Sequence, residues 1–112
     1  MSDINAIINA LLKFRDERDW EQFHDTKNLA IALSIEAAEL NELLLWKSDK
    51  NSEDIDKQKF KEELADVFAY AFLLAEKHQL NVREIVLEKI QLNAKKYPVD
   101  KSKGSSKKYN DL

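Results

Sequence analysis

The chain contains one glycine and one proline in 112 residues, and this scarcity restricts its fold more than any other feature. Tight β-turns depend on Gly and Pro, so a fold built from many hairpins would need more of both. Long helices joined by short loops need few glycines and prolines. Hydrophobic residues make up 44% of the chain and charged residues 35%, enough of each for a globular domain with a core. The sequence therefore predicts an all-α fold.

The spacing of hydrophobic residues predicts four helices in a four-helix-bundle-like arrangement. The expected helices cover residues 3–18, 27–47, 53–79 and 82–96. Pro98 ends the last of them, because proline cannot continue a helix. We expect residues 1–97 to form one helical domain and the Lys/Ser-rich residues 98–112 to form a mobile tail.

Polar residues at the expected helix starts are suited to capping. Asp25 or Thr26 can cap the second helix, and Ser52 can cap the third. Asn81 and Glu84 have the spacing of a capping box at the start of the fourth. These residues support the predicted order of helices and loops.

Composition excludes several classes of protein. The chain has no cysteine, which rules out disulfides, thiolate metal sites and cysteine nucleophiles. The formal net charge is -3, whereas a nucleic-acid-binding domain normally has a basic excess. A signal peptide needs a basic start and an unbroken apolar run, whereas Asp3 and other polar residues interrupt the N-terminal segment. No stretch approaches the roughly 20 apolar residues of a membrane span. We therefore expect a cytoplasmic protein that binds neither polymeric nucleic acid nor membranes.

Acidic residues lie within the hydrophobic stripes of the second and third helices. On an ideal helix, Glu39 and several leucines fall within about 60° of Glu36. Glu63 and Asp66 repeat this pattern on the third helix, where Tyr70 lies beside them. Two helices joined by a short loop are antiparallel neighbours, so the two stripes should face each other. We expect the four carboxylates to converge within an apolar wall.

Four converging carboxylates need a counter-ion, because like charges with little water around them raise each other's pKa. No Lys or Arg lies on either stripe. Carboxylate oxygens without Cys or His suit Mg²⁺, with Mn²⁺ as the alternative, and Mg²⁺ favours sharing its ligands with phosphate. A di-iron centre would need Glu-x-x-His, and the histidines, His24 and His78, are not placed for it. The cluster therefore predicts a magnesium site for a phosphate-bearing substrate.

Two other interpretations fit part of this pattern. The acids would be surface residues if the helices were phased differently. Alternatively, the chain would be a non-enzymatic helical adaptor whose apolar second helix binds a partner helix, although this leaves the acid pairs without a purpose. That helix is apolar around much of its circumference, more than one small chain can cover. We therefore expect an obligate homo-oligomer such as a homodimer.

Aromatic residues gather before and after the second expected helix. Trp20, Phe23 and His24 precede it, and Trp46 lies near its end. Such rings suit stacking on a flat base, a contact of about 1–3 kcal/mol. They equally suit hydrophobic staples that close the bundle, and His24 also suits a cap. Tyr70 can hydrogen-bond a sugar or phosphate, or occupy the core with its hydroxyl at the edge.

Basic residues are concentrated late in the chain. Lys89, Asn93 and Lys96 fall on about one face of the fourth helix and can hold phosphate oxygens. Residues 104–108, GSSKK, could close over a polyphosphate or remain a solvated tail. No Walker-type glycine-rich loop is present, so metal and side chains would have to hold the phosphates.

The acid pattern resembles the E-x-x-E … E-x-x-D pattern of the MazG-like all-α nucleoside triphosphate pyrophosphohydrolases. Glu36 and Glu39 form its first half, and the second half lies in EELAD, residues 62–66. The similarity covers roughly residues 10–112 and points to the dCTP pyrophosphatase-like branch. The segments that carry it are RDWEQFHDTKNLAIALSIEAAELNELLLWK, EELADVFAY, NAKKYP and SSKKYNDL.

This resemblance implies Mg²⁺-dependent hydrolysis between the α and β phosphates of dCTP or a related or modified dNTP. The products would be a nucleoside monophosphate and pyrophosphate, and the role would be clearance of surplus or non-canonical nucleotides. It implies metal ligation and catalysis by Glu36, Glu39, Glu63 and Asp66. It implies base and sugar contacts by Trp20, Glu21, Gln22, Phe23, His24, Trp46 and Tyr70.

The resemblance also bears on assembly, mechanism and base preference. It suggests a homotetramer of paired dimers. In the expected mechanism, a metal-polarised water is deprotonated by Glu36 or Glu39 and attacks in line. Relatives of this branch can offer a histidine from the first helix toward the base, whereas Leu11 stands at the corresponding position here. The exact base preference therefore stays open.

Overall fold

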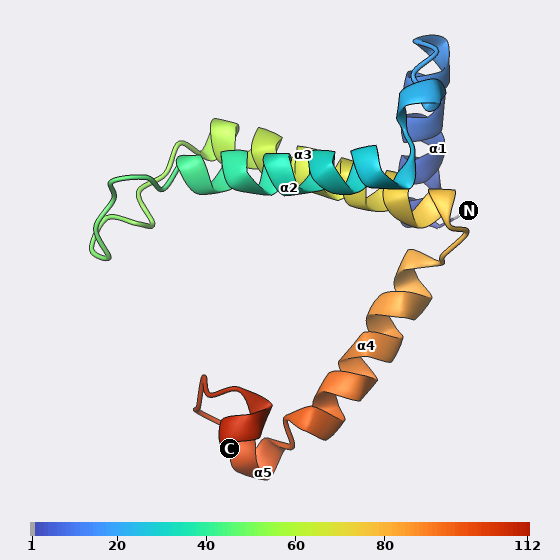
Figure 1. Cartoon of the computed structure of the whole chain (residues 1–112). Helices are drawn as coiled ribbons and strands as arrows, with labels where there is room; N and C mark the ends of the chain where they lie inside the picture. The colour runs from blue at the N-terminus through green and yellow to red at the C-terminus, as the bar shows by residue number, and fades with distance from the viewer. Residues whose placement is uncertain (1) are drawn as a thin grey trace. The chain divides into compact units, whose positions relative to one another are not determined.

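The computed structural model describes residues 2–112, which form two compact units divided after Gln79. The helices of the first unit are α1 (Asp3–Glu17), the 3-10 helix η1 (Glu21–Phe23), α2 (Thr26–Glu42) and α3 (Lys57–Lys77) (Figure 1). Those of the second unit are α4 (Val82–Lys96), α5 (Val99–Ser102) and the 3-10 helix η2 (Tyr109–Asp111). Residues 2–112 contain no strand, so the all-α prediction is confirmed.

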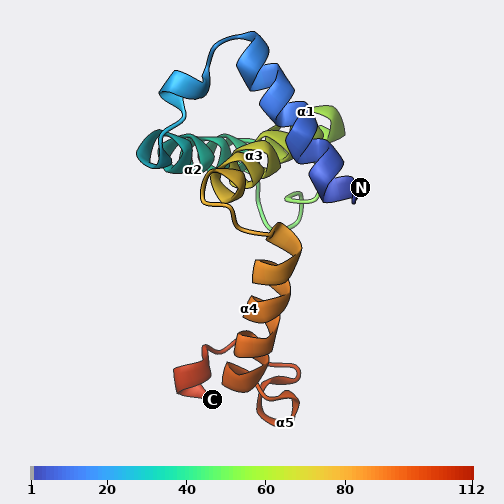
Figure 2. The same ribbon diagram turned by 90° about the vertical axis from the view of Figure 1, so that its right-hand side faces the viewer.

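The first unit is built on an antiparallel pair of helices. α2 and α3 lie side by side along their length, and α1 packs against α3 (Figures 1 and 2). A hydrogen bond of 2.9 Å between Thr26 Oγ1 and His78 Nε2 joins the start of α2 to the end of α3. The two hydrophobic stripes thus face each other as the short connection predicts.

Two of the predicted helix starts are confirmed. The Asp25 carboxylate caps α2 by accepting a hydrogen bond of 2.7 Å from the backbone N–H of Asn28. The Asn81 side chain caps α4 by accepting one of 3.0 Å from the N–H of Glu84. Each cap satisfies one of the donors that the first helical turn leaves free.

The third helix begins later than expected. Its cap is Asp56 rather than Ser52, because the Asp56 carboxylate accepts from the N–H groups of Gln58 and Lys59 at 3.1 and 3.2 Å. The predicted start at residue 53 is therefore wrong. The predicted end at residue 79 is also two residues late, since Gln79 has a left-handed φ of 56° that stops the helix.

The second helix ends at Glu42, so the prediction that it continues to residue 47 is wrong. Leu44 and Leu45 donate backbone hydrogen bonds to carbonyls three residues earlier, which tightens the chain into turns. Trp46 then has a φ of 67°, in the left-handed region where helices end. The run of leucines that indicated a longer helix belongs to this turn.

The second unit consists of α4 and a folded C-terminal segment. Residues 98–112, expected to be a tail, contain α5 and η2. The ring of Tyr109 meets that of Tyr97 edge to face at 6.1 Å, and the Lys96 ammonium lies 5.0 Å from the Tyr109 ring centroid. These contacts hold the segment against the end of α4. The unit begins at Leu80, whereas we expected a boundary between residues 97 and 98.

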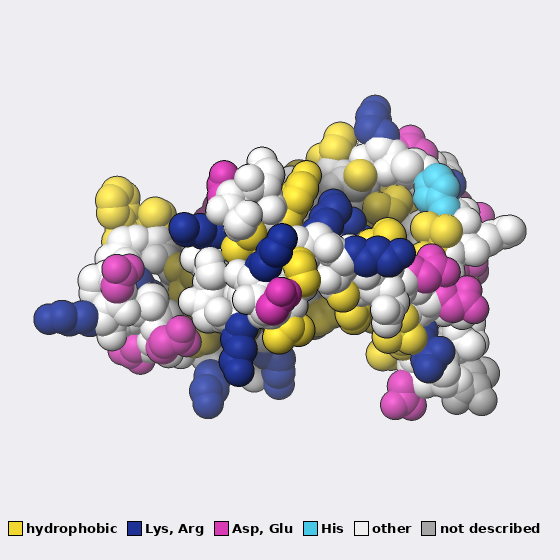
Figure 3. Space-filling view, turned by 90° about the horizontal axis from the view of Figure 1, so that it is seen from below, with side chains coloured by type: hydrophobic (Ala, Val, Ile, Leu, Met, Phe, Trp, Pro, Cys, Tyr) yellow, Lys and Arg dark blue, Asp and Glu magenta, His cyan; other side chains and the backbone are white. Residues whose placement is uncertain are grey.

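The chain buries few hydrophobic side chains by itself. Among residues 2–112 the buried hydrophobic residues are Leu29, Leu73 and Ala75. Many large hydrophobic side chains are exposed, and Figure 3 shows such groups at the surface among charged ones. Roughly half-exposed examples on α2, α3 and α4 include Ile31, Ile35, Phe68 and Ile90. No helix within the described residues is long and apolar enough to cross a membrane.

Candidate functional site

Three of the four predicted metal ligands converge between α2 and α3. Glu36 and Glu39 come from successive turns of α2, and Glu63 comes from the facing side of α3. Each offers a carboxylate oxygen, and these oxygens lie within 4.8 Å of one another. All three side chains are half-buried. This spacing allows the three oxygens to bind one cation.

Asp66, the fourth predicted ligand, lies one turn beyond Glu63 on α3 and is exposed. It is not part of the group of three acids that lie within 4.8 Å of one another. Its charge nevertheless contributes, after burial and Glu39, to raising the pKa of both Glu36 and Glu63. Asp66 is therefore close enough to act on the cluster electrostatically.

The cluster carries uncompensated negative charge. Burial raises the pKa of Glu36 to about 7, and the carboxylates of Glu39, Asp66 and Glu63 add to the effect. Burial also raises the pKa of Glu63, with Glu39 as the next cause. One oxygen of Glu36 and one of Glu63 are buried without a hydrogen-bond partner. Unpaired buried carboxylate oxygens are costly, so this donor set fits a hard divalent cation.

A cavity of about 250 Å³ adjoins the acids and is bounded by α1, the segment before α2 and α3. Its lining residues include Leu11, Phe14, Trp20, His24, Asp66 and Tyr70. Most of these side chains present carbon or ring atoms. The lining of this cavity therefore contains one predicted metal ligand, Asp66. It also contains three predicted base or sugar contacts, Trp20, His24 and Tyr70.

Two polar groups of the cavity have perturbed pKa values. Burial raises the pKa of the Tyr70 hydroxyl, and the charges of Glu36, Asp66 and Glu39 raise it further. Tyr70 thus stays protonated at neutral pH and can donate a hydrogen bond. Burial, with a smaller contribution from Arg15, lowers the pKa of His24, and its Nδ1 is buried without a partner. The imidazole is therefore neutral and free to bond with a ligand.

The other residues of the aromatic segment are placed differently. Glu21 faces a neighbouring cavity of about 190 Å³, which His24 also lines. The Gln22 amide donates to the Asp19 carbonyl at 3.0 Å and to its carboxylate at 3.2 Å. Phe23 is 58% exposed. Of residues 20–24, only Trp20 and His24 line the cavity beside Asp66.

Two further predicted substrate contacts, Trp46 and Asn93, are not among the residues that line that cavity. Trp46 is 93% exposed in the turn after α2 and lines neither of these two cavities. Its position follows from the early end of α2 rather than from its sequence distance to Glu36. Asn93 is exposed on α4, in the second unit.

Sequence reasoning missed four residues of the cavity wall, Phe14 and Arg15 on α1 and Ala69 and Leu73 on α3. Phe14 and Arg15 line the cavity together with Leu11. Their spacing on α1 places all three on one side of that helix. This spacing could have identified them, but nothing in the sequence showed that this side of α1 faces the acid-bearing helix.

Comparisons with known proteins agree with this geometry. The model of the MazG-like family matches residues 31–112, which include all four acids. Rat dCTP pyrophosphatase 1 is 41% identical over 80 residues, or 67% of this chain and 47% of the rat protein. Human dCTP pyrophosphatase 1 is 39% identical over the same shares. This chain thus spans about half the length of the curated relatives that it matches.

A solved structure is similar over nearly the whole fold. The crystal structure of a pyrophosphatase from Archaeoglobus fulgidus superimposes with a TM-score of 0.83 and 35% sequence identity. The match covers 88% of this chain and 94% of the archaeal chain. The helical arrangement described above is therefore shared with a pyrophosphatase of similar size.

Proposed function

This chain belongs to the MazG-like family, and from this premise we propose that it is a metal-dependent nucleoside triphosphate pyrophosphohydrolase. The proposed substrate is dCTP or a related or modified dNTP, cleaved to a nucleoside monophosphate and pyrophosphate. Clearance of surplus or non-canonical nucleotides is the proposed role. The observation that carries the proposal is the cluster of half-buried glutamates beside an aromatic cavity. The dCTP pyrophosphatase relatives and the archaeal pyrophosphatase support it.

The proposed metal ligands are Glu36, Glu39, Glu63 and Asp66, with Mg²⁺ as the cation. The buried, unpartnered oxygens of Glu36 and Glu63 support this assignment, as does a donor set made only of hard oxygens. When bound, Mg²⁺ would neutralise charge on the triphosphate and orient the α-phosphorus. Mn²⁺ has the same ligand preferences and is the expected substitute.

The chain's own groups supply the proton transfer and the orientation. Glu36 is the proposed general base, because its carboxylate lies in the cluster that would hold the metal beside the attacking water. Glu39, in the same cluster, is the alternative. The attacking water forms a bond to the α-phosphorus, its proton passes to the carboxylate, and pyrophosphate leaves. The protonated Tyr70 hydroxyl can donate a hydrogen bond to the sugar or the α-phosphate.

The cavity beside Asp66 is the proposed base site. Its volume of about 250 Å³ is below the 300–1,000 Å³ typical of drug-sized ligands, which suits a single flat base. Trp20 offers a ring for stacking, and the free Nδ1 of His24 offers a polar contact. The contacts expected from Glu21, Gln22, Phe23, Trp46 and Asn93 stay predictions.

We further propose that the working form is a homodimer or homotetramer. Among the described residues of the first unit, the buried hydrophobic side chains are Leu29, Leu73 and Ala75, while large groups such as Ile31, Ile35 and Phe68 are half-exposed. Such a small buried core gives little hydrophobic stabilisation, so a second copy would supply the missing contacts. Light scattering at micromolar concentration should show an oligomer. A stable, active monomer would contradict this part of the proposal.

A substrate panel tests the activity directly. Purified protein is incubated with each common dNTP and NTP and with 5-substituted dCTP analogues, and pyrophosphate and monophosphate are measured. We expect pyrophosphate release with Mg²⁺ and none with EDTA, and the release to return when Mg²⁺ is added in excess. Release of inorganic phosphate alone, or no release with any nucleotide, would refute the proposed reaction.

A further inference from the structure

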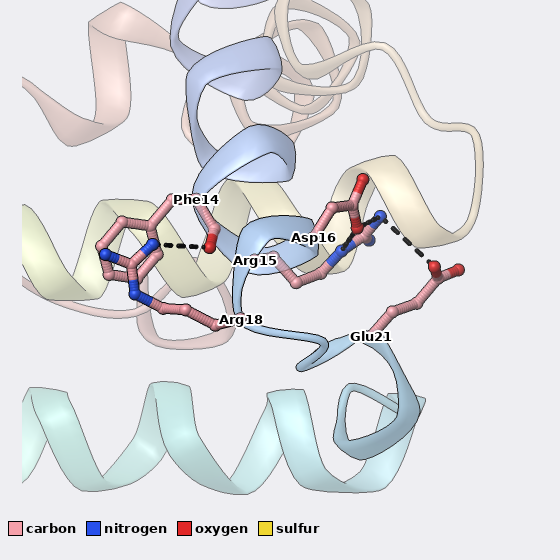
Figure 4. Close-up of polar contacts among 5 residues, drawn as sticks. All are labelled: Phe14, Arg15, Asp16, Arg18 and Glu21. Atoms are coloured by element: carbon pink, nitrogen blue, oxygen red, sulfur yellow. Dashed lines mark hydrogen bonds and ion pairs between the residues drawn. The ribbon is translucent and has the colours of Figure 1, made fainter.

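Two arginines at the end of α1, Arg15 in its last turn and Arg18 at its C-cap, contact the elements that form the proposed base cavity (Figure 4). The side chain of Arg18 turns back onto Phe14, and its Nη1 donates a hydrogen bond of 2.9 Å to the Phe14 carbonyl. The guanidinium carbon lies 3.6 Å from the centroid of the Phe14 ring. A planar cation against an aromatic face is a favourable contact, so Arg18 restrains this ring.

The restrained Phe14 ring contacts the ring of Trp20. The two rings meet edge to face, with centroids 5.7 Å apart and an angle of 71° between their planes. Trp20 is 43% exposed, and the Phe14 ring covers part of the remainder of its surface. Arg18, Phe14 and Trp20 thus form a continuous series of contacts that reaches the proposed base site.

Arg15 contacts the segment that follows Trp20. Only 15% of its side chain is exposed, and its Nη2 lies 2.8 Å from the Asp16 carboxylate and 3.7 Å from that of Glu21. Its backbone carbonyl accepts a hydrogen bond of 3.1 Å from the N–H of Trp20. Arg15 also shares the walls of both cavities with His24. Its side chain therefore links the end of α1 to Glu21 and borders the two cavities that His24 also lines.

The turn between α1 and η1 is held in one conformation. Asp19 has a φ of 53°, which is uncommon for a residue with a side chain. The Gln22 amide donates to both the carbonyl and the carboxylate of Asp19. At the far end of the segment, the Asn28 side chain donates to the Phe23 carbonyl at 3.0 Å. The backbone of residues 19–24 is thus fixed, and the two arginines act on its side chains.

We propose that Arg15 and Arg18 are positioning residues that hold Trp20 and His24 in the geometry of the base site. Arg18 acts through the Phe14 ring, and Arg15 acts through Glu21 and the shared cavity wall. This inference rests on the proposed function, because it concerns how the nucleotide base is bound. Neither arginine lies in the carboxylate cluster, so both control the affinity for the nucleotide and leave the rate of the chemical step unchanged.

The test replaces each arginine separately with glutamine and measures the kinetics of pyrophosphate release. In both Arg15→Gln and Arg18→Gln we expect KM to rise about three- to tenfold, the size expected for losing one partly exposed charged contact, with kcat nearly unchanged. Lys13→Gln is the matched control, because Lys13 is exposed on the same helix and lines neither cavity. Arg18→Lys keeps a cation over the Phe14 ring and should recover most of the affinity.

A second readout follows Trp20 without substrate. The chain has two tryptophans, so in a Trp46→Phe background the emission reports Trp20 alone. Acrylamide quenching should increase in Arg18→Gln and remain at the parental level in Lys13→Gln. Variants that lower the unfolding temperature but leave KM and quenching unchanged would overturn the inference. If the parental chain releases no pyrophosphate from any nucleotide, the proposed function fails. The quenching measurement needs no substrate, so unchanged quenching in Arg18→Gln overturns the positioning role independently of that result.

Discussion

The carboxylate cluster and the corner formed by residues 14–24, which borders the proposed base cavity, both adjoin α3 but differ in how their polar groups are satisfied. In the cluster, Glu36 and Glu63 each hold a buried oxygen without a partner. In the corner, the arginines are paired, Arg15 with Asp16 and Arg18 with the Phe14 carbonyl, and the buried atom without a partner is a ring nitrogen of the neutral His24 rather than a carboxylate oxygen. The cluster is therefore incomplete without a cation, whereas the corner is organised before any ligand binds.

This difference separates two kinds of functional site. Side chains of regular helices place the acids, so their positions depend on packing between α2 and α3 and on charge. The cavity depends on an irregular segment whose conformation is maintained by specific hydrogen bonds. Substitution in the cluster should therefore affect turnover and metal dependence, and substitution in the corner should affect nucleotide affinity.

The largest expected effect is the loss of turnover when a cluster acid is neutralised. Glu36→Gln, Glu39→Gln, Glu63→Gln and Asp66→Asn should each lower kcat by about 100-fold or more, because each removes a charge that holds the metal or accepts the proton. Pyrophosphate release at saturating Mg²⁺ measures this. Glu62→Gln is the matched control, since Glu62 is exposed and accepts a hydrogen bond from Gln58 at 2.9 Å. Near-normal turnover in the four variants would remove the distinction between the two sites.

Magnesium should stabilise the protein through the cluster alone. At about 100 times its dissociation constant, a ligand that binds only the folded state adds about 2.7 kcal/mol to the free energy of unfolding. We therefore expect the unfolding temperature to rise by several degrees with MgCl₂ in the parental chain and in Arg15→Gln, but not in Glu36→Gln. Differential scanning fluorimetry without nucleotide measures this. A non-enzymatic adaptor would show no response to the cation.

Removal of the Trp20 ring should weaken nucleotide binding rather than chemistry. Trp20→Ala removes a stacking contact of about 1–3 kcal/mol, so KM should rise at least fivefold while kcat changes little. The same substitution at Phe23, which is more exposed and does not line the cavity, should have a smaller effect. Steady-state kinetics over a range of nucleotide concentrations distinguish these cases. A fall in kcat with unchanged KM would instead show that Trp20 acts in the chemical step, as the cluster acids are proposed to do.

The smallest expected effect is a pH dependence of stability in EDTA. The pKa of Glu36 is raised from 4.5 to about 7, so between these values the folded chain keeps a proton that the unfolded chain has released. The free energy of unfolding should therefore fall as pH rises from about 4.5 to 7 and stay low above that range. Glu36→Gln removes this contribution, so it should be more stable relative to the parental chain at pH 8 than at pH 5. If the unfolding temperatures of the parental chain and of Glu36→Gln change in parallel with pH, the raised pKa assigned to Glu36 is contradicted.

The acids were predictable because helix geometry repeats. Glu36 and Glu39 share a face wherever α2 is helical, and Glu63 lies on the facing stripe of α3 once the helices pair. Trp46 shows where this reasoning fails, because it assumed that the helix continues past Glu42. Similar hydrophobic residues fill the helix and the turn after it, so periodicity did not locate the boundary.

The sequence alone determined the all-α class, the caps at Asp25 and Asn81 and the shared helix face of Glu36 and Glu39, because these depend on neighbours a few residues apart. Only the tertiary structure decided that α1 supplies Phe14 and Arg15 to the cavity wall. It also decided that two glutamate oxygens are buried without partners. Both features arise where segments distant in the chain pack together, and local residue preferences do not specify which faces meet.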